Sequence, residues 1–334
     1  MQVLVTGGNG FIGRAIVERL LARGDSVRVI GRARYAELEA RGVAGYRVDL
    51  AEAEDGSLDR ALRGCDLIFH VAAKAGVWGR AEDYYRNNVS ATQRLVRAAV
   101  RAGVPKLVFT SSPSVVFGDG PVEGADESAA YPARYLAPYP QTKALAERFV
   151  LAQKDILTTA IRPPLVWGPR DPHIVPRLLA RARAGRLVQI GDGRNIVDVT
   201  YIDNAADAHL LAAAALSEHS AVRGRAYFIG QAQQVNLWMF INTLITRAGL
   251  RPITRRISLT TALRITTLLE AAYRLAGSDK EPPLTRLTAT QLATSRWFDQ
   301  TAAQRDLGYL AQVPTEEGLQ RTIAALPSAE EQLY

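Results

Sequence analysis

A tyrosine and a lysine four residues apart, Tyr139 and Lys143, have the spacing of a proton-transfer pair. The chain has 12 tyrosines, and only Tyr139 is followed four residues later by a lysine. Because residues i and i+4 share one face of a helix, the two side chains point the same way. The adjacent Pro140 favours a helix start, which puts the phenol near a positive helix terminus. Both influences predict a phenol pKa below its usual value of about 10, suited to a general acid/base.

A hydroxyl-bearing segment supplies a second chemical group. The apolar run at residues 107–110 predicts a buried strand, and Ser111 and Ser112 follow it directly. Ligands bind at the carboxyl ends of strands in parallel α/β sheets, so a serine here can hydrogen-bond a substrate oxygen as charge develops on it. The residues alone leave Ser111, Ser112 and Ser114 as alternatives for this function.

A glycine-rich turn joins the first predicted strand, residues 2–6, to the first predicted helix, residues 11–23. The first glycine allows a tight turn, the second lets the backbone approach a pyrophosphate, and the third lets the helix pack closely on the strand. The helix N-terminus then offers free N–H groups and a positive dipole end to the phosphates. This turn predicts a dinucleotide cofactor, with contacts from Gly7, Asn9, Gly10, Phe11, Ile12 and Gly13.

The end of the second predicted strand, residues 26–30, bears on the choice between NAD and NADP. NAD-binding chains usually carry an acid here for the ribose hydroxyls, whereas this chain carries Arg32 and Arg34. Both can pair with a 2′-phosphate, which predicts NADP(H); the alternative is that they are surface arginines. The other predicted cofactor contacts are Asp49 and Leu50 near the adenine, and Ala72, Ala73 and Lys74 after the fourth strand.

These groups are positioned by short apolar runs that alternate with amphipathic helices through the first half of the chain. Right-handed crossovers between parallel strands then predict an α/β fold with a doubly wound Rossmann sheet. We assign residues 1–162 to an NADP-binding Rossmann domain. Residues 163–334 are mainly a smaller C-terminal substrate-binding lobe, some elements of which return to the sheet. The ligand cleft is expected between the two parts.

Together the motifs resemble the extended short-chain dehydrogenase/reductases. The resemblance rests on Thr-Gly-x-x-Gly-x-x-Gly at 6–13, Phe-Thr-Ser-Ser at 109–112 and Tyr-x-x-x-Lys at 139–143, and it covers nearly the whole chain. It implies four catalytic residues and two backbone positions beside the nicotinamide. The four are Ser112, Tyr139 as the acid/base, Lys143 as the ribose-binding lysine and Asn88 as a structural and proton-relay residue; the two are Pro163 and Val166.

Residues 110–117, 157–163 and 168–172 narrow the resemblance to the 3β-hydroxysteroid dehydrogenase branch. Within it the chain is similar to sterol 4α-carboxylate 3-dehydrogenases and to the 2-alkyl-3-oxoalkanoate reductases of bacterial long-chain olefin synthesis. Both groups interconvert a β-hydroxy acid and a β-keto acid. The predicted NADP preference and the lack of a long apolar segment favour the second. A sterol or steroid dehydrogenase, a nucleotide-sugar epimerase or dehydratase, and a non-catalytic NADP(H) sensor are the alternatives.

The substrate side carries weaker signals. The carboxylate of a β-keto acid needs a cation, and residues 257–278 carry a broad apolar stripe. Such a helix can cover an alkyl-binding cavity or the core, lie on a membrane surface or contact other pathway enzymes. His70 and His173 are expected to be structural. Five basic residues lie in loops expected near the cleft: Lys74, Arg80, Arg170, Arg177 and Arg194.

Composition argues against several function classes. The formal charge of +8 is spread over 334 residues without interleaved aromatic residues, which argues against nucleic-acid binding. The single cysteine, Cys65, precedes an apolar run and is expected to be a small buried hydrophobe, as in a reducing compartment. No metal site, secretory signal or membrane span is predicted. We expect a cytoplasmic enzyme with a small-molecule substrate, and a homodimer of the kind common in the family.

Overall fold

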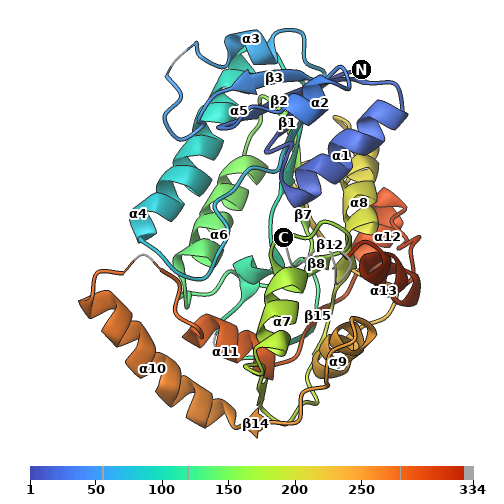
Figure 1. The fold of residues 1–334 in the computed structure, drawn as a ribbon. Helices are drawn as coiled ribbons and strands as arrows, with labels where there is room; N and C mark the ends of the chain where they lie inside the picture. Colours follow the sequence, from blue (N-terminus) through green and yellow to red (C-terminus); the bar gives the residue numbers. More distant parts are fainter. Residues whose placement is uncertain (55, 119, 279, 327–334) are drawn as a thin grey trace.

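Seven parallel strands form the central sheet, in the order β12-β7-β5-β4-β1-β2-β3 (Figure 1). The structure is a computed structural model that describes residues 1–54, 56–118, 120–278 and 280–326. The chain order reverses between β1 and β4, and ligands of such sheets bind at the carboxyl ends of the strands there. The strands are β1 (Gln2–Thr6), β2 (Ser26–Gly31), β3 (Ala44–Arg47), β4 (Leu67–His70), β5 (Lys106–Thr110), β7 (Leu157–Arg162) and β12 (Ala226–Phe228).

Helices cover both faces of the sheet because successive strand residues point to opposite sides. Val3 and Val5 lie in one apolar core with residues of α1 and α8, whereas Leu4 lies in a second core with residues of α5 and α6. One face is covered by α1 (Phe11–Ala22) and α8 (Ile202–Ala215). The other is covered by α3 (Asp59–Leu62), α5 (Ala91–Arg101) and α6 (Pro138–Leu151).

The doubly wound Rossmann sheet predicted from the sequence is confirmed. The first helix ends one residue earlier than expected, at Ala22, and Gly24 closes it with φ +82° and an N–H bond to the Leu21 carbonyl. Cys65 is buried, as predicted. Two elements from the second half of the chain, α8 and β12, belong to the sheet layers, so the residues after 163 divide between this core and a smaller lobe.

The smaller lobe contains α7, α9, α10 and α11, which lie below the sheet in Figure 1. Among the described residues, no helix combines the length and apolar character needed to cross a bilayer. The remaining helices are α2 (Ala36–Glu39), α4 (Ala81–Tyr84), α7 (Ile174–Arg183), α9 (Leu237–Arg247), α10 (Leu259–Leu275), α11 (Arg286–Ala293), α12 (Thr301–Leu307) and α13 (Thr315–Ala324). Short strands form smaller sheets. One has the strand order β13 (Val235–Asn236), β10 (Ile196–Val197), β15 (Arg296–Phe298) and β6 (Val122–Ala125). In addition, β11 (Thr200–Tyr201) pairs with β8 (Val166–Trp167), and β14 (Arg256–Ile257) pairs with β9 (Gln189–Ile190).

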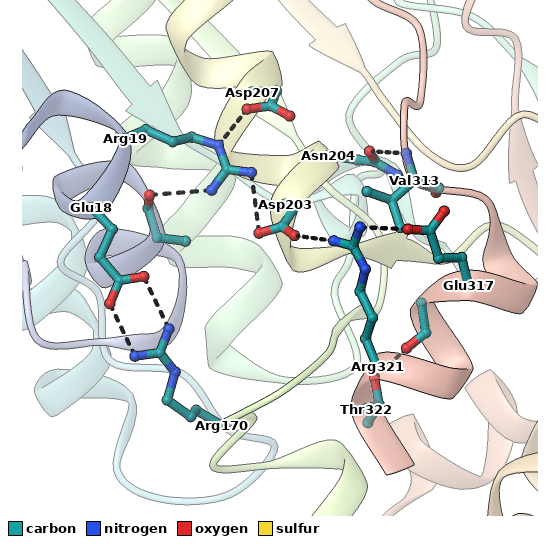
Figure 2. Close-up of polar contacts among 12 residues, drawn as sticks. Glu18, Arg19, Arg170, Asp203, Asn204, Asp207, Val313, Glu317, Arg321 and Thr322 are labelled. Atoms are coloured by element: carbon teal, nitrogen blue, oxygen red, sulfur yellow. Dashed lines mark hydrogen bonds and ion pairs between the residues drawn. The ribbon is translucent and has the colours of Figure 1, made fainter. Parts of the chain in front are cut away.

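Ion pairs join the first helix to elements from the second half of the chain (Figure 2). Arg19 of α1 pairs with Asp203 of α8 at 3.1 Å, and Asp203 also pairs with Arg321 of α13 at 3.3 Å. Glu18 accepts two hydrogen bonds from Arg170, each 2.9 Å long. The helix that follows the glycine turn is therefore held by residues more than 150 positions away in the sequence.

Candidate active site

The glycine turn has the geometry that its sequence predicts. Gly7 has φ +66°, and the Gly10 N–H donates to the Gly7 carbonyl at 2.8 Å. A Cβ at Gly13 would lie 2.2 Å from that carbonyl oxygen, so glycine is needed for α1 to begin this close to the turn. The first turn of α1 carries no acidic residue and no side-chain cap, which leaves its N–H groups for phosphate oxygens.

A cleft of about 940 Å³ extends from this turn to Tyr139 and Lys143. Its volume lies within the range of ligand pockets in proteins, about 300–1,000 Å³. The residues present fit a nicotinamide dinucleotide, because nearly all of the predicted cofactor contacts line this one cleft. They are Gly7, Asn9, Gly10, Phe11, Ile12, Arg32, Asp49, Leu50, Ala72, Ala73, Lys74, Pro163 and Val166.

The two arginines predicted to bind a 2′-phosphate have different surroundings. Arg32 lines the cleft, whereas Arg34 does not line it and pairs through Nε with Glu39 Oε2 at 3.1 Å. Tyr35, which the sequence reasoning missed, also lines the cleft, and its hydroxyl fills the space that a Cβ on Gly31 would need. The geometry therefore supports Arg32 over Arg34 as a phosphate ligand.

Two other predicted cofactor residues also have local partners. Asp49 Oδ1 accepts the Ala51 N–H at 2.9 Å, which shapes the turn after β3. The Lys74 ammonium lies 3.7 Å from Asp83 Oδ2 and 5.3 Å from the centre of the Tyr84 ring. Both side chains border the cleft, and their contacts with a cofactor stay predictions.

Lys143 is buried within α6 and points toward the end of β5. Its Nζ donates to the Thr110 carbonyl at 2.7 Å and lies 4.0 Å from the centre of the Phe109 ring. Burial lowers the pKa of Lys143 from 10.5 to about 7, and the carboxylate of Glu147, one turn later, opposes this shift. An amine with this pKa gains and loses protons near neutral pH, as a proton relay requires.

Tyr139 lies in the first turn of α6, as predicted, but the prediction of a lowered phenol pKa is wrong for this structure. Desolvation raises the pKa of Tyr139 above its usual value of 10, and the Ser112 hydroxyl opposes the rise. The Lys143 ammonium is directed at the Thr110 carbonyl. The phenol is therefore protonated at neutral pH, which is the form that can donate a proton to a ketone oxygen.

The structure separates the three candidate serines. Ser112 lines both the cofactor cleft and a second cavity, whereas Ser111 lines only the first and Ser114 only the second. The Ser112 Oγ lies 2.8 Å from the Ser114 Oγ and accepts the Ser114 N–H at 3.2 Å, where it caps a short 3₁₀ helix at Pro113–Val116. Ser112 is thus the serine placed beside both ligand spaces.

Asn88 is buried in a π-helical turn, Tyr85–Ser90, that connects α4 to α5. Its Oδ1 accepts the Lys74 N–H at 2.7 Å, and its Nδ2 donates to the Lys74 carbonyl at 3.1 Å and to Thr142 Oγ1 at 3.0 Å. These bonds join the loop after β4 to α6, which agrees with the structural part of its predicted role. Its part in proton relay stays a prediction.

The second cavity is apolar and has a volume of about 390 Å³. It shares Ser112, Tyr139, Pro163, Leu165 and Ile174 with the cofactor cleft, so the two spaces meet at the hydroxyls of Ser112 and Tyr139. An apolar cavity with a few polar groups at one end suits an alkyl ligand with one oxygenated carbon. Most of its other walls come from the smaller lobe, including Leu178, Leu187, Leu237, Phe240, Ile241, Leu284, Leu287 and Leu292.

Most of the cations predicted to hold a substrate carboxylate lie elsewhere or have partners. Arg80 and Arg194 are exposed and line neither space, and Arg170 is paired with a carboxylate of α1. Arg177 does line the apolar cavity, but it bonds to a glutamate at 3.2 Å. Arg296, which no sequence motif marks, also lines this cavity and was missed.

His70 has the structural role expected of it. Its Nδ1 accepts the Thr6 hydroxyl at 2.8 Å, and its Nε2 donates to Thr92 Oγ1 at 2.8 Å. Burial lowers the pKa of His70 to about 3, so the ring is neutral at physiological pH. His173 borders the cofactor cleft, and its backbone N–H donates to Asp171 Oδ1 at 2.7 Å.

Helix α10 occupies most of the predicted apolar segment 257–278. Its Glu270 is buried and accepts the Arg286 N–H at 2.7 Å, while Leu268 and Leu275 are 74% and 91% exposed. Among the described residues, the wall of the apolar cavity on this side comes from α11, not from α10. The interpretation of this segment as a cover over the alkyl site is therefore not supported, whereas its alternative role as a cover over the core is borne out by Ala262, which lies in the main apolar core.

Comparison with known proteins agrees with this site. Residues 4–260 match the model of the 3-beta hydroxysteroid dehydrogenase/isomerase family. The chain is 44% identical over 330 residues to a 2-alkyl-3-oxoalkanoate reductase of Stenotrophomonas maltophilia, a match that covers 97% of this chain and 99% of the relative. It is 43% identical over 335 residues to a 2-alkyl-3-oxoalkanoate reductase of Shewanella oneidensis, covering 97% and 86%.

Among solved structures, MoeE5 in complex with UDP-glucose and NAD matches all of this chain over its own whole length, with a TM-score of 0.75 and 28% identity. That neighbour agrees with a nicotinamide cofactor in the cleft described above. The Rossmann sheet, the paired cavities and the sequence relatives lead to one assignment: the chain is an oxidoreductase of the short-chain dehydrogenase/reductase type and belongs to the 3β-hydroxysteroid dehydrogenase/isomerase family.

Proposed function

We propose that the protein uses NADPH to reduce a 2-alkyl-3-oxoalkanoic acid, a long-chain β-keto acid, to the 2-alkyl-3-hydroxyalkanoic acid in olefin biosynthesis. The observation that carries the proposal is the apolar cavity that meets the cofactor cleft at Ser112 and Tyr139. Such a cavity accommodates alkyl chains, whereas a nucleotide-sugar substrate would need a polar one. The names of the two relatives at 43% and 44% identity support the same substrate class.

The chain's own residues account for the proton side of this reaction. The Ser112 hydroxyl and the Tyr139 phenol hydrogen-bond the ketone oxygen, and the bound nicotinamide supplies the hydride. Tyr139 donates its proton to the oxygen as negative charge develops there. Lys143, with a pKa of about 7, can pass a proton back toward the phenol, and Asn88 holds the loop that borders this path.

Replacing the phenol tests the reaction. Tyr139→Phe is expected to lower kcat for 2-alkyl-3-oxoalkanoate reduction by about 10²–10⁴-fold, because it removes the proton donor. NADPH binding, followed by fluorescence, is expected to be unchanged. Full activity in this variant would overturn the assignment. Turnover of sterol carboxylates, steroids or nucleotide sugars in preference to β-keto acids would replace the proposed substrate class.

The proposed NADP preference rests on Arg32, which lines the cleft, whereas Arg34 is paired with Glu39. Arg32→Ala is expected to raise KM for NADPH about 10- to 100-fold, the value of a charge-assisted hydrogen bond, with little change for NADH. Arg34→Ala is the matched control, since it removes an exposed arginine two residues away. Equal efficiency of the unmodified enzyme with NADH would contradict the preference.

We further propose a cytoplasmic homodimer, as the family resemblance implies. The exposed leucines of α10, Leu268 and Leu275, are a candidate contact with pathway enzymes or with a membrane surface. Light scattering of the purified protein, and of a Leu268→Glu variant, tests the dimer and whether α10 forms part of its interface. A monomer at micromolar concentration would contradict the first point.

A further inference from the structure

The apolar cavity contains three arginines among the described residues that line it: Arg177, Arg181 and Arg296. Two of them have hydrogen-bond acceptors. Arg177 Nη1 donates to Glu281 Oε1 at 3.2 Å, and Arg181 Nη2 donates to the Pro283 carbonyl at 2.9 Å. Neither guanidinium is therefore fully available to a ligand anion.

Arg296 differs from both, because its two terminal nitrogens have no hydrogen-bond partner. The residue is only 5% exposed, and its Nε donates to Thr294 Oγ1 at 3.1 Å. Burial lowers the pKa of Arg296 only to about 10, so the guanidinium is charged at neutral pH. Burying a charge without a partner costs several kcal/mol. A folded protein retains such a charge when a bound ligand supplies the missing partner.

Contacts around Arg296 connect it to the catalytic hydroxyls. Its guanidinium stacks 4.1 Å from the centre of the Phe117 ring, and Phe117 directly follows the 3₁₀ helix that Ser112 caps. Phe298, two residues after Arg296 on β15, lines the same cavity and stacks on Phe117. Arg296 therefore packs on the segment that follows Ser112, and both residues line the same cavity.

The acid that directly follows β10, Asp198, does not neutralise this charge. Asp198 Oδ2 accepts the Phe298 N–H at 2.7 Å, and its other oxygen has no partner. Burial raises the pKa of Asp198 to about 7, so a large fraction of this carboxyl is uncharged at neutral pH. The missing counter-ion is therefore expected to come from the substrate.

We propose that the Arg296 guanidinium binds the carboxylate of the substrate. This inference rests on the proposed function, because a 2-alkyl-3-oxoalkanoate carries its carboxylate two carbons from the ketone. That separation requires the cation to lie in the cavity that contains Ser112 and Tyr139, as Arg296 does. The ion pair between Arg296 and the carboxylate holds the ketone against the two hydroxyls, while the alkyl chains contact the apolar walls. Arg296 is then a specificity-determining residue that favours acids over neutral ketones.

The test compares an acid with its neutral ester. A 2-alkyl-3-hydroxyalkanoic acid and its methyl ester are oxidised with NADP⁺ by the unmodified enzyme, Arg296→Met, Arg296→Lys and Arg194→Met. Arg296→Met is expected to lower kcat/KM for the acid at least about 30-fold and to leave the ester within about threefold. Arg296→Lys is expected to recover part of the acid activity. Arg194→Met, an exposed cation outside the cavity, is expected to match the unmodified enzyme.

Equal losses for acid and ester in Arg296→Met, or no loss for the acid, would overturn the proposal. If Arg296→Met does not fold, the ratio of acid to ester activity in Arg296→Lys decides: a lower ratio than in the unmodified enzyme supports carboxylate binding, and an unchanged ratio refutes it. A saturated 2-alkylalkanoic acid, which cannot react, separates this inference from the proposed function. Its Kd by calorimetry is expected to rise at least about 30-fold in Arg296→Met even if no β-keto acid is turned over, and an unchanged Kd would refute the anion site.

Discussion

Glu147 and Arg162 form a buried ion pair whose removal has a calculable effect on stability. Arg162 donates from Nε to Glu147 Oε2 at 2.9 Å and from Nη2 to Oε1 at 2.7 Å, and the Tyr131 hydroxyl donates to Oε1 at 2.6 Å. The Arg162 side chain is 3% exposed and the Glu147 side chain is 0% exposed. Removing one partner of such a pair costs about 3–5 kcal/mol, because the remaining charge stays buried without compensation. Glu147→Gln preserves the shape of the side chain and is expected to lower the free energy of unfolding by that amount.

Urea unfolding followed by circular dichroism measures this loss in Glu147→Gln, Arg162→Met and the double variant. Arg162→Met leaves the carboxylate unpaired, whereas the double variant leaves no buried charge at this position. The double variant is therefore expected to lose at least about 2 kcal/mol less than the sum of the single losses. Additive losses, or a loss below about 1 kcal/mol in Glu147→Gln, would refute this account of the pair. Glu147→Gln is also expected to lower the pKa of Lys143 further, because the Glu147 carboxylate raises that pKa.

Three further predictions concern the cofactor turn, a buried histidine and the buried amide. Gly13→Ala is expected to abolish cofactor binding in fluorescence titrations, because its Cβ would lie 2.2 Å from a backbone oxygen, whereas Gly120→Ala meets no atom within 4 Å, lies outside the cofactor cleft and serves as control. Burial lowers the pKa of His209 from 6.5 to about 4, so its contribution to stability is present above pH 6.5 and falls by about 1.4 kcal/mol per pH unit as the pH drops toward 4. His209→Gln should lower the slope by this amount in urea titrations at several pH values, and the slope that remains includes the contribution of His70, whose pKa is lowered to about 3. Asn88→Ala breaks three hydrogen bonds, one of them to Thr142, and is expected to cost about 1–3 kcal/mol in the free energy of unfolding.

Local patterns in the sequence were sufficient for the parts of the site that lie within one turn or one helix. The glycine spacing fixes the turn before α1, and the four-residue spacing of Tyr139 and Lys143 fixes their common helix. The direction of the phenol pKa was not predictable, since it follows from the burial of Tyr139 in the folded chain, which the local sequence does not show. Sequence position likewise did not show that Arg34 pairs with Glu39.

Arg296 was not predictable for a further reason. It lies on β15, whose register pairs it with Val122 of β6 and Val197 of β10, so three segments far apart in the sequence meet at this point. No periodicity within residues 290–300 indicates that a cation there lines the cavity that contains Ser112 and Tyr139. The proposal for Arg296 rests instead on its burial and its unpartnered nitrogens, which only the folded chain shows.

The return of α8 and β12 to the sheet layers has a consequence for protein engineering. Residues of α8 share the apolar core of β1 and α1, and β12 pairs with β7, although both elements follow residue 163. A chimera that exchanges residues 163–334 between two relatives as one block would therefore replace part of the core beneath the cofactor turn. Recombination that aims to transfer substrate preference should exchange residues 174–190 and 237–298, which line the apolar cavity, and keep 202–215 and 226–228 with their native partners. The part of the chain that can be exchanged without replacing this core is thus smaller than the second half of the chain.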